Sequence, residues 1–82
     1  MDEARCGSRL MRILTDHGCE PGNDYADAEA QVWYDEAGLA DQDRERGLAF
    51  AVDKEWIIPS RDRLGIFQIT QAGFDAATTG RS

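Results

Sequence analysis

The chain has 82 residues, of which sixteen are Asp or Glu and nine are Lys or Arg, so its formal net charge is −7. This length permits one small domain with a single hydrophobic core and excludes a second lobe bearing another site. The acidic balance favours solubility and repels phosphate backbones at long range.

The composition also bears on localisation and domain organisation. No apolar run is long enough to span a bilayer, and the N-terminal segment MDEARCGSRL is too charged for a secretory signal. We therefore expect a cytoplasmic protein that makes no membrane contact. It should form one domain over residues 1–82, with an ordered core over about 3–77 and a frayed tail over 78–82.

The first predicted helix extends from Glu3 to His17, and Gly18 supplies its stop. Residues at helical spacing form one face: Cys6, Leu10, Ile13, Leu14 and His17. Three arginines form another, which we interpret as solvated: Arg5, Arg9 and Arg12. We expect His17 to interact with the last carbonyls of the helix.

Cys6, Cys19 and His17 are the only thiol and imidazole groups of the chain. A structural zinc site uses four ligands at recognisable spacing, so these three residues do not predict a metal site. We interpret Cys6 as a small buried apolar residue and expect no disulfide with Cys19 in a cytosolic chain.

A turn over Glu20 to Asn23 precedes the second predicted helix. Asn23 or Asp24 is a suitable N-cap, the helix should continue to about Ala37, and Gly38 should end it. One stripe follows helical spacing: Ala26, Ala30, Trp33 and Ala37. Other large side chains lie off it: Tyr25, Val32 and Tyr34. We expect Leu39 to fill the core between the second and third helices.

The third predicted helix covers Gln42 to Lys54, with Asp41 as its N-cap. Its apolar stripe is narrow: Leu48, Ala51 and Val52. Two β-rich runs follow, Trp56 to Pro59 and Leu64 to Ile69, around a charged connection, which predicts a β-hairpin.

Pro59 has no amide hydrogen and should stand at a strand end or on a sheet edge. After the hairpin, Thr70 is a suitable cap for a final short helix from Gln71 to Ala77.

Trp56-Ile57 stands at the end of a helix, and a short charged hairpin and the segment Ile69-Thr70-Gln71-Ala72-Gly73 follow it. This arrangement resembles the second half of a winged helix-turn-helix domain. The resemblance extends from about Ser8 to Ala77. It implies an α+β fold with a three-helix core, a C-terminal β-hairpin wing, a short final helix and a vestigial first strand near Asp24 or Leu39. Glu55 stands where the family commonly has glycine, and a non-glycine residue is strained at positive φ.

Between Asp16 and Asp43 the chain has nine carboxylates and no Lys or Arg. The resemblance would place this region against nucleic acid, where Lys and Arg supply most of the affinity. We therefore expect a non-catalytic module that recognises another protein, preferably one with a basic surface, whose nucleic-acid site it could occupy. The expected surface combines acidic and aromatic residues: Asp27, Glu29, Trp33, Asp35, Glu36, Asp41, Asp43 and Phe50.

The alternative is a small DNA-binding transcriptional regulator, formed as a homodimer, with recognition helix 42–54 and wing 60–64. Its DNA contacts would come from the cations of these segments: Arg44, Arg46, Lys54, Arg61 and Arg63. We favour the interpretation that Arg44 and Arg46 are solvated and pair at short spacing with Asp41, Asp43 or Glu45.

A structural subunit of a larger assembly is a third class. Enzymatic chemistry and cofactor binding are not expected, because the eight glycines are dispersed and form no phosphate loop or nucleophile elbow.

Overall fold

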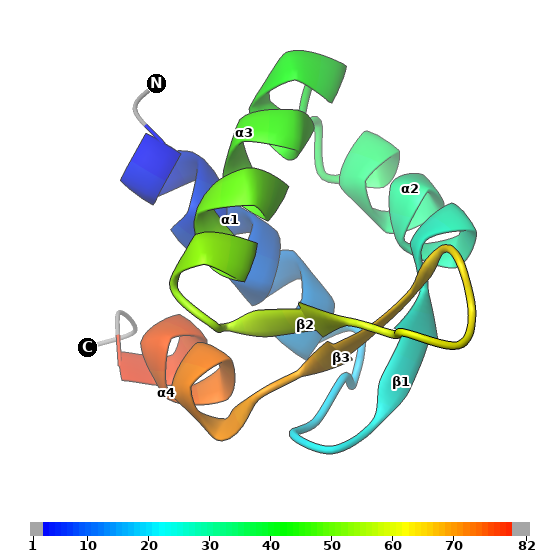
Figure 1. Ribbon diagram of the computed structural model, residues 1–82. Helices are drawn as coiled ribbons and strands as arrows, with labels where there is room; N and C mark the ends of the chain where they lie inside the picture. The colour runs from blue at the N-terminus through cyan, green and yellow to red at the C-terminus, as the bar shows by residue number, and fades with distance from the viewer. Residues whose placement is uncertain (1–2, 80–82) are drawn as a thin grey trace.

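The computed structural model describes residues 3–79, which form four helices and a three-stranded antiparallel sheet (Figure 1). The elements follow in the order α1 (Glu3–Asp16), β1 (Asp24–Ala26), α2 (Asp27–Glu36), α3 (Asp41–Asp53), β2 (Ile57–Pro59), β3 (Ile66–Ile69) and α4 (Gln71–Thr79). The α+β class is confirmed, and the order is compatible with a winged-helix-like arrangement. None of the helices in this part of the chain has the length and apolar character needed to cross a bilayer.

Helix α1 forms the centre of the core. Its predicted apolar face is buried, and Met11, which was not predicted, is buried with it. The helix ends at Asp16, and Gly18 leaves the helical conformation at φ +88°. His17 is exposed, so it does not belong to the buried face.

Helix α2 begins at Asp27, two or three residues later than predicted, because Asp24 opens a strand and neither it nor Asn23 caps the helix. Strand β1 pairs with β3, with Tyr25 opposite Phe67, and Ala26 becomes the N-cap. The vestigial first strand expected near Asp24 is therefore confirmed. The predicted apolar stripe is wrong in part: Tyr34 is buried beside Ala30, while Ala37 is exposed. Tyr34 turns inward because the core, including Tyr25 of β1, lies on that side of the helix.

Helix α3 begins at Asp41, so this residue is not the N-cap. Ala40 takes that position and makes no side-chain capping bond. Lys54 follows the last turn, and Glu55 then adopts φ 59°, the left-handed conformation that favours glycine. The amide of Trp56 donates to the carbonyl oxygen of Ala51 at 2.8 Å, which turns the chain from α3 into β2.

Two glycines allow α1 and α3 to cross with their backbones in contact. A Cβ atom at Gly47 would lie 2.6 Å from the carbonyl oxygen of Cys6, and one at Gly7 would lie 2.6 Å from the ring of Phe50. Leu39 is buried between α2 and α3, as predicted. The three helices α1, α2 and α3 gather on one side of the sheet (Figure 1).

The predicted hairpin is confirmed, with sheet order β1-β3-β2. Pro59 ends the edge strand β2, as its missing amide hydrogen requires. Thr70 caps α4, because its Oγ1 accepts a hydrogen bond from the amide of Gly73 at 3.1 Å. The helix continues to Thr79, so the prediction of a tail is wrong for residues 78 and 79, and residues 80–82 lie outside the described chain.

We predict that Gly47→Ala lowers the free energy of unfolding by about 2 kcal/mol or more, although alanine is the better helix former. The added methyl group would meet the backbone of Cys6, which cannot move aside as a side chain can. Urea unfolding followed by circular dichroism measures the change. Ala49→Leu, on the exposed face of the same helix, should change stability by less than about 0.5 kcal/mol. Equal effects of the two substitutions would contradict the close crossing of α1 and α3.

Candidate functional site

The solvent-facing side of α3 is a stripe of exposed residues at helical spacing: Gln42, Glu45, Arg46, Ala49 and Asp53. In a winged-helix protein bound to DNA, this is the side that would meet the major groove. The stripe has two carboxylates and one guanidinium, so it offers a polyanion little attraction.

Arg44 lies on the opposite side of α3, toward α2. Its side chain is 19% exposed, and its Nη1 lies 3.8 Å from Oδ2 of Asp27, the first residue of α2. The predicted short-range pairing of Arg44 is therefore wrong, because the helix directs this side chain across to a neighbouring element. Arg46 is exposed and forms no ion pair with a described residue, so its predicted pairing is also wrong.

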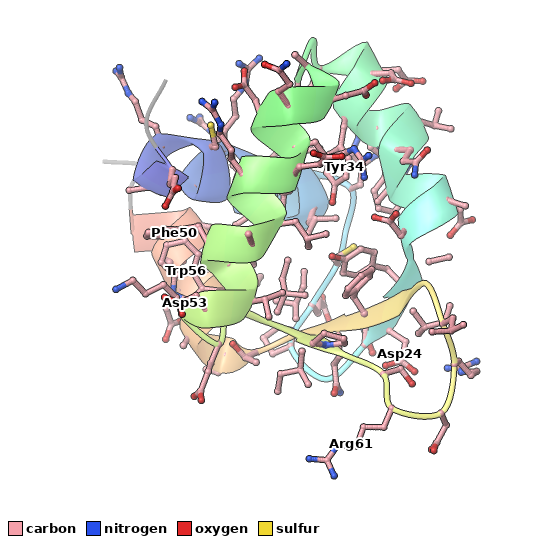
Figure 2. The ribbon with its side chains drawn as sticks, turned by 45° about the horizontal axis from the view of Figure 1, so that its top comes forward. Asp24, Tyr34, Phe50, Asp53, Trp56 and Arg61 are labelled. Carbon is pink, nitrogen blue, oxygen red and sulfur yellow. The ribbon has the colours of Figure 1, made fainter. Side chains whose placement is uncertain are left out.

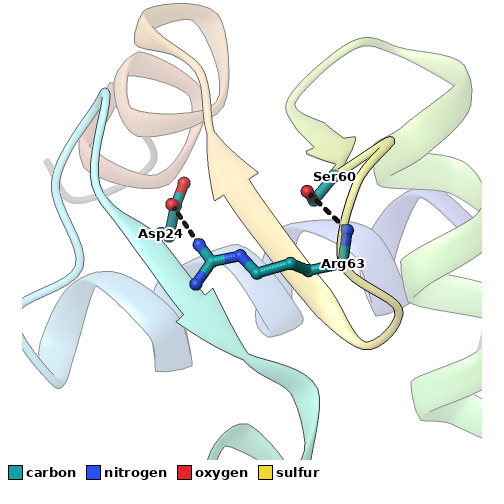
Figure 3. Close-up of polar contacts among 3 residues, drawn as sticks. All are labelled: Asp24, Ser60 and Arg63. Carbon is teal, nitrogen blue, oxygen red and sulfur yellow. Dashed lines mark hydrogen bonds and ion pairs between the residues drawn. The ribbon is translucent and has the colours of Figure 1, made fainter.

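The wing arginines behave differently from each other. Arg63 crosses the outer face of the sheet, where its Nη2 donates to Oδ2 of Asp24 at 2.9 Å (Figure 3). Its amide also donates to Oγ of Ser60 at 3.2 Å. Arg61 is exposed at the wing and separated from α3 (Figure 2). Arg61 is therefore the wing arginine that forms no ion pair with any residue of the described range 3–79.

The aromatic end of α3 lies apart from both surfaces. Phe50 and Trp56 stand on the side of α3 away from α2 and form an edge-to-face pair with ring centroids 5.4 Å apart (Figure 2). Lys54 places its Nζ 5.5 Å from the centroid of the Phe50 ring. Phe50 therefore lies apart from the acidic residues of α2, and Lys54 lies apart from Arg61.

The acidic residues of the expected surface fall into two groups. Glu29, Asp35 and Glu36 are exposed on α2, and Asp41 is exposed where α3 begins. Two others are half-buried: Asp27 faces Arg44, and Asp43 faces α1. There the burial of Cys6 raises the pKa of its thiol, and the charge of Asp43 raises this pKa further.

Trp33, which lies among the acidic residues of α2, contacts His17, the residue that follows α1. Its indole stacks on the imidazole of His17, with ring centroids 4.6 Å apart and an interplanar angle of 6°. Trp33 is half-buried and His17 is exposed. Sequence reasoning missed this pair, because the turn over 18–23 brings the two rings together and no spacing in the sequence encodes the contact.

A polar cluster is buried where β1, α2 and α3 meet. The hydroxyls of Tyr25 and Tyr34 and the Nε of Arg44 are inaccessible to solvent and have no hydrogen-bond partner among residues 3–79. Burial raises the pKa of both phenols far above the usual value near 10. Unpartnered buried polar groups weaken a core, so this cluster stabilises the fold less than apolar contacts would.

Features of a catalytic or metal centre are sparse in the described chain. Residues 3–79 contain no group of three or more His, Cys, Asp or Glu side chains arranged to hold a metal ion, and no pocket for a small molecule. Cys6 and Cys19 are free thiols. No family model, curated protein or solved structure matches this chain.

We predict that stability falls as pH rises above about 10. There the unfolded chain ionises its tyrosines while the folded chain keeps both protonated, which costs about 1.4 kcal/mol per pH unit for each residue. Tyr25 and Tyr34 are the only tyrosines, so tyrosinate absorbance should rise together with loss of helical circular dichroism. The double variant Tyr25→Phe, Tyr34→Phe should lose most of this pH dependence. Tyrosine ionisation well before unfolding would contradict the burial of the phenols.

We predict that Arg44→Met leaves the free energy of unfolding within about 1 kcal/mol of the parent chain, or raises it, because Asp27 stays partly exposed in the first turn of α2, where Gln31 still donates to its carboxylate. The guanidinium has one long ion pair and a buried Nε without a partner, whereas methionine fills the same space without a charge. Urea unfolding measures the effect, with the exposed Arg46→Met as the matched control. A loss of more than about 2 kcal/mol would show that the Asp27 contact is far stronger than its geometry indicates.

Proposed function

We propose that this chain is a non-catalytic binding module of winged-helix type that recognises another protein through an acidic surface. This surface consists of Glu29, Trp33, Asp35 and Glu36 of α2 and Asp41 at the start of α3. The winged-helix assignment is supported by the order of elements and by the sheet order β1-β3-β2. The sequence motifs around Trp56-Ile57 and Ile69-Thr70 support it as well.

One observation supports protein recognition most strongly. From Asp27 to Asp53 the chain has eight carboxylates and two arginines, and Arg44 is directed to Asp27. A DNA-binding protein of this architecture would place this region against phosphates, whose neutralisation by Lys and Arg is the main source of its affinity. An excess of carboxylates in this region would repel the phosphates instead of attracting them.

The same charges favour a basic partner. Exposed carboxylates around an aromatic residue accelerate the encounter with a positively charged surface, and the buried part of the contact provides the affinity. A special case is a partner that itself binds nucleic acid, because the acidic surface would then occupy its phosphate-binding site.

The regulator hypothesis has support from three exposed cations that form no ion pair with a described residue: Arg46 of α3, Lys54 after it and Arg61 of the wing. A homodimer would double them. This alternative predicts salt-sensitive binding of duplex DNA that disappears in the double variant Arg46→Ala, Arg61→Ala.

We predict that the chain binds a labelled arginine-rich peptide, while a labelled 20-base-pair duplex gives no saturable binding at about 50 mM salt. Fluorescence anisotropy measures both. Peptide affinity should fall at least tenfold in the double variant Glu29→Lys, Glu36→Lys, because the surface loses two carboxylates and gains two cations. The control Asp62→Lys changes a carboxylate of the wing, outside the surface, and should have little effect.

Saturable duplex binding that weakens steeply between about 50 and about 200 mM salt, and that requires Arg46 and Arg61, would overturn the proposal in favour of the regulator.

A further inference from the structure

The outer face of α2 has a distinct pattern. Glu29, Val32, Trp33 and Glu36 occupy positions i, i+3, i+4 and i+7, which lie on one side of a helix. We call these four residues the α2 seam. Two apolar side chains stand at its centre, and one carboxylate stands at each end.

The described chain leaves most of this seam open to solvent: Glu29, Val32 and Glu36 are exposed, and Trp33 is half-buried. Helix α2 directs Ala30 and Tyr34 into the core and Asp27 toward Arg44, so the opposite side faces solvent. Val32 is 55% exposed, whereas the other large exposed apolar residues, Ile58 and Leu64, belong to the hairpin. A single exposed apolar residue is common on protein surfaces, and Val32 is distinguished by its place next to Trp33 at the i+3, i+4 spacing that helix anchors use.

His17 widens the apolar centre. Its ring, in the turn that follows α1, stacks on the indole of Trp33 with nearly parallel planes, and this contact restricts the orientation of the indole. A fixed, half-buried aromatic residue loses little conformational entropy on binding, which is the property of aromatic anchors in interfaces.

Charge identifies the occupant. A second copy of this chain would bring the same carboxylates against Glu29 and Glu36, and a nucleic acid would bring phosphates, so both are repelled. The complementary surface is a helix with apolar residues at its centre and Lys or Arg at its ends. The two carboxylates are seven residues apart, about 10 Å along the axis, which matches cations seven residues apart on a partner helix.

We propose that the α2 seam docks a basic amphipathic helix of a partner protein, with apolar side chains on Val32 and Trp33 and cations beside Glu29 and Glu36. This inference rests on the proposed function and specifies which part of the acidic surface makes the contact and what the partner presents.

The test uses two synthetic peptides of identical composition. One forms a helix with leucines on a central stripe and arginines seven residues apart; the other has the same residues scrambled. Titration of the isotope-labelled chain, followed by backbone amide NMR, gives affinity and location together. The patterned peptide should shift the amides of 29–36, His17 and the indole of Trp33, and should bind at least tenfold more tightly than the scrambled one.

Two matched variants test the apolar centre. Val32→Ser should weaken the patterned peptide at least tenfold without changing stability, because this side chain is exposed. Ile58→Ser removes an equally exposed apolar residue from the hairpin and should leave affinity unchanged.

Equal binding of the two peptides, or shifts centred on the outer stripe of α3, would overturn the seam while leaving a protein-binding acidic surface in place. Failure of both peptides to bind would overturn the proposed function together with the seam.

Discussion

The crossing of α1 and α3 at Gly7 and Gly47 determines what the rest of the molecule presents. A Cβ atom at Gly47 would collide with the backbone of Cys6, so α3 can pack this closely against α1 only with a glycine on the side that faces it. That choice fixes the rotation of α3 about its axis. Arg44 then points toward α2, while the residues that point to solvent are Gln42, Glu45, Arg46, Ala49 and Asp53. A packing constraint in the core therefore sets the charge of the helix face that would otherwise meet DNA.

The two ion pairs, like the helix packing, determine which cations near α3 and the wing have no carboxylate of the described chain beside them. Asp27 lies beside Arg44, and Asp24 binds Arg63 across the sheet, so two of the five cations near α3 and the wing are directed to carboxylates of the same chain. Exposed pairs such as Arg63 with Asp24 add little stability. Each pair holds one arginine beside one carboxylate, so neither arginine compensates the exposed carboxylates Glu29, Asp35 and Glu36 of α2.

Patterns within single segments predicted most of the fold. The helical spacing of Leu10, Ile13 and Leu14, the two β-rich runs and the capping residue Thr70 all indicated their elements, because each signal is local. The contacts that shape the candidate site are not local. His17 meets Trp33, and Arg44 meets Asp27, only after consecutive helices pack against each other in the folded chain. The core face of α2 was misassigned for the same reason: pairing of β1 with β3 sets where this helix begins.

The exposed carboxylates of α2 and of the outer stripe of α3 should give these two helices a shared region of negative potential. The most direct measurement compares how a cationic and an anionic paramagnetic cosolute relax each amide proton, because their ratio reports the local potential. We expect stronger relaxation by the cationic cosolute along α2 and the outer stripe of α3, with a weaker preference at the wing tip near Arg61. Stronger relaxation by the anionic cosolute along α3 would contradict it.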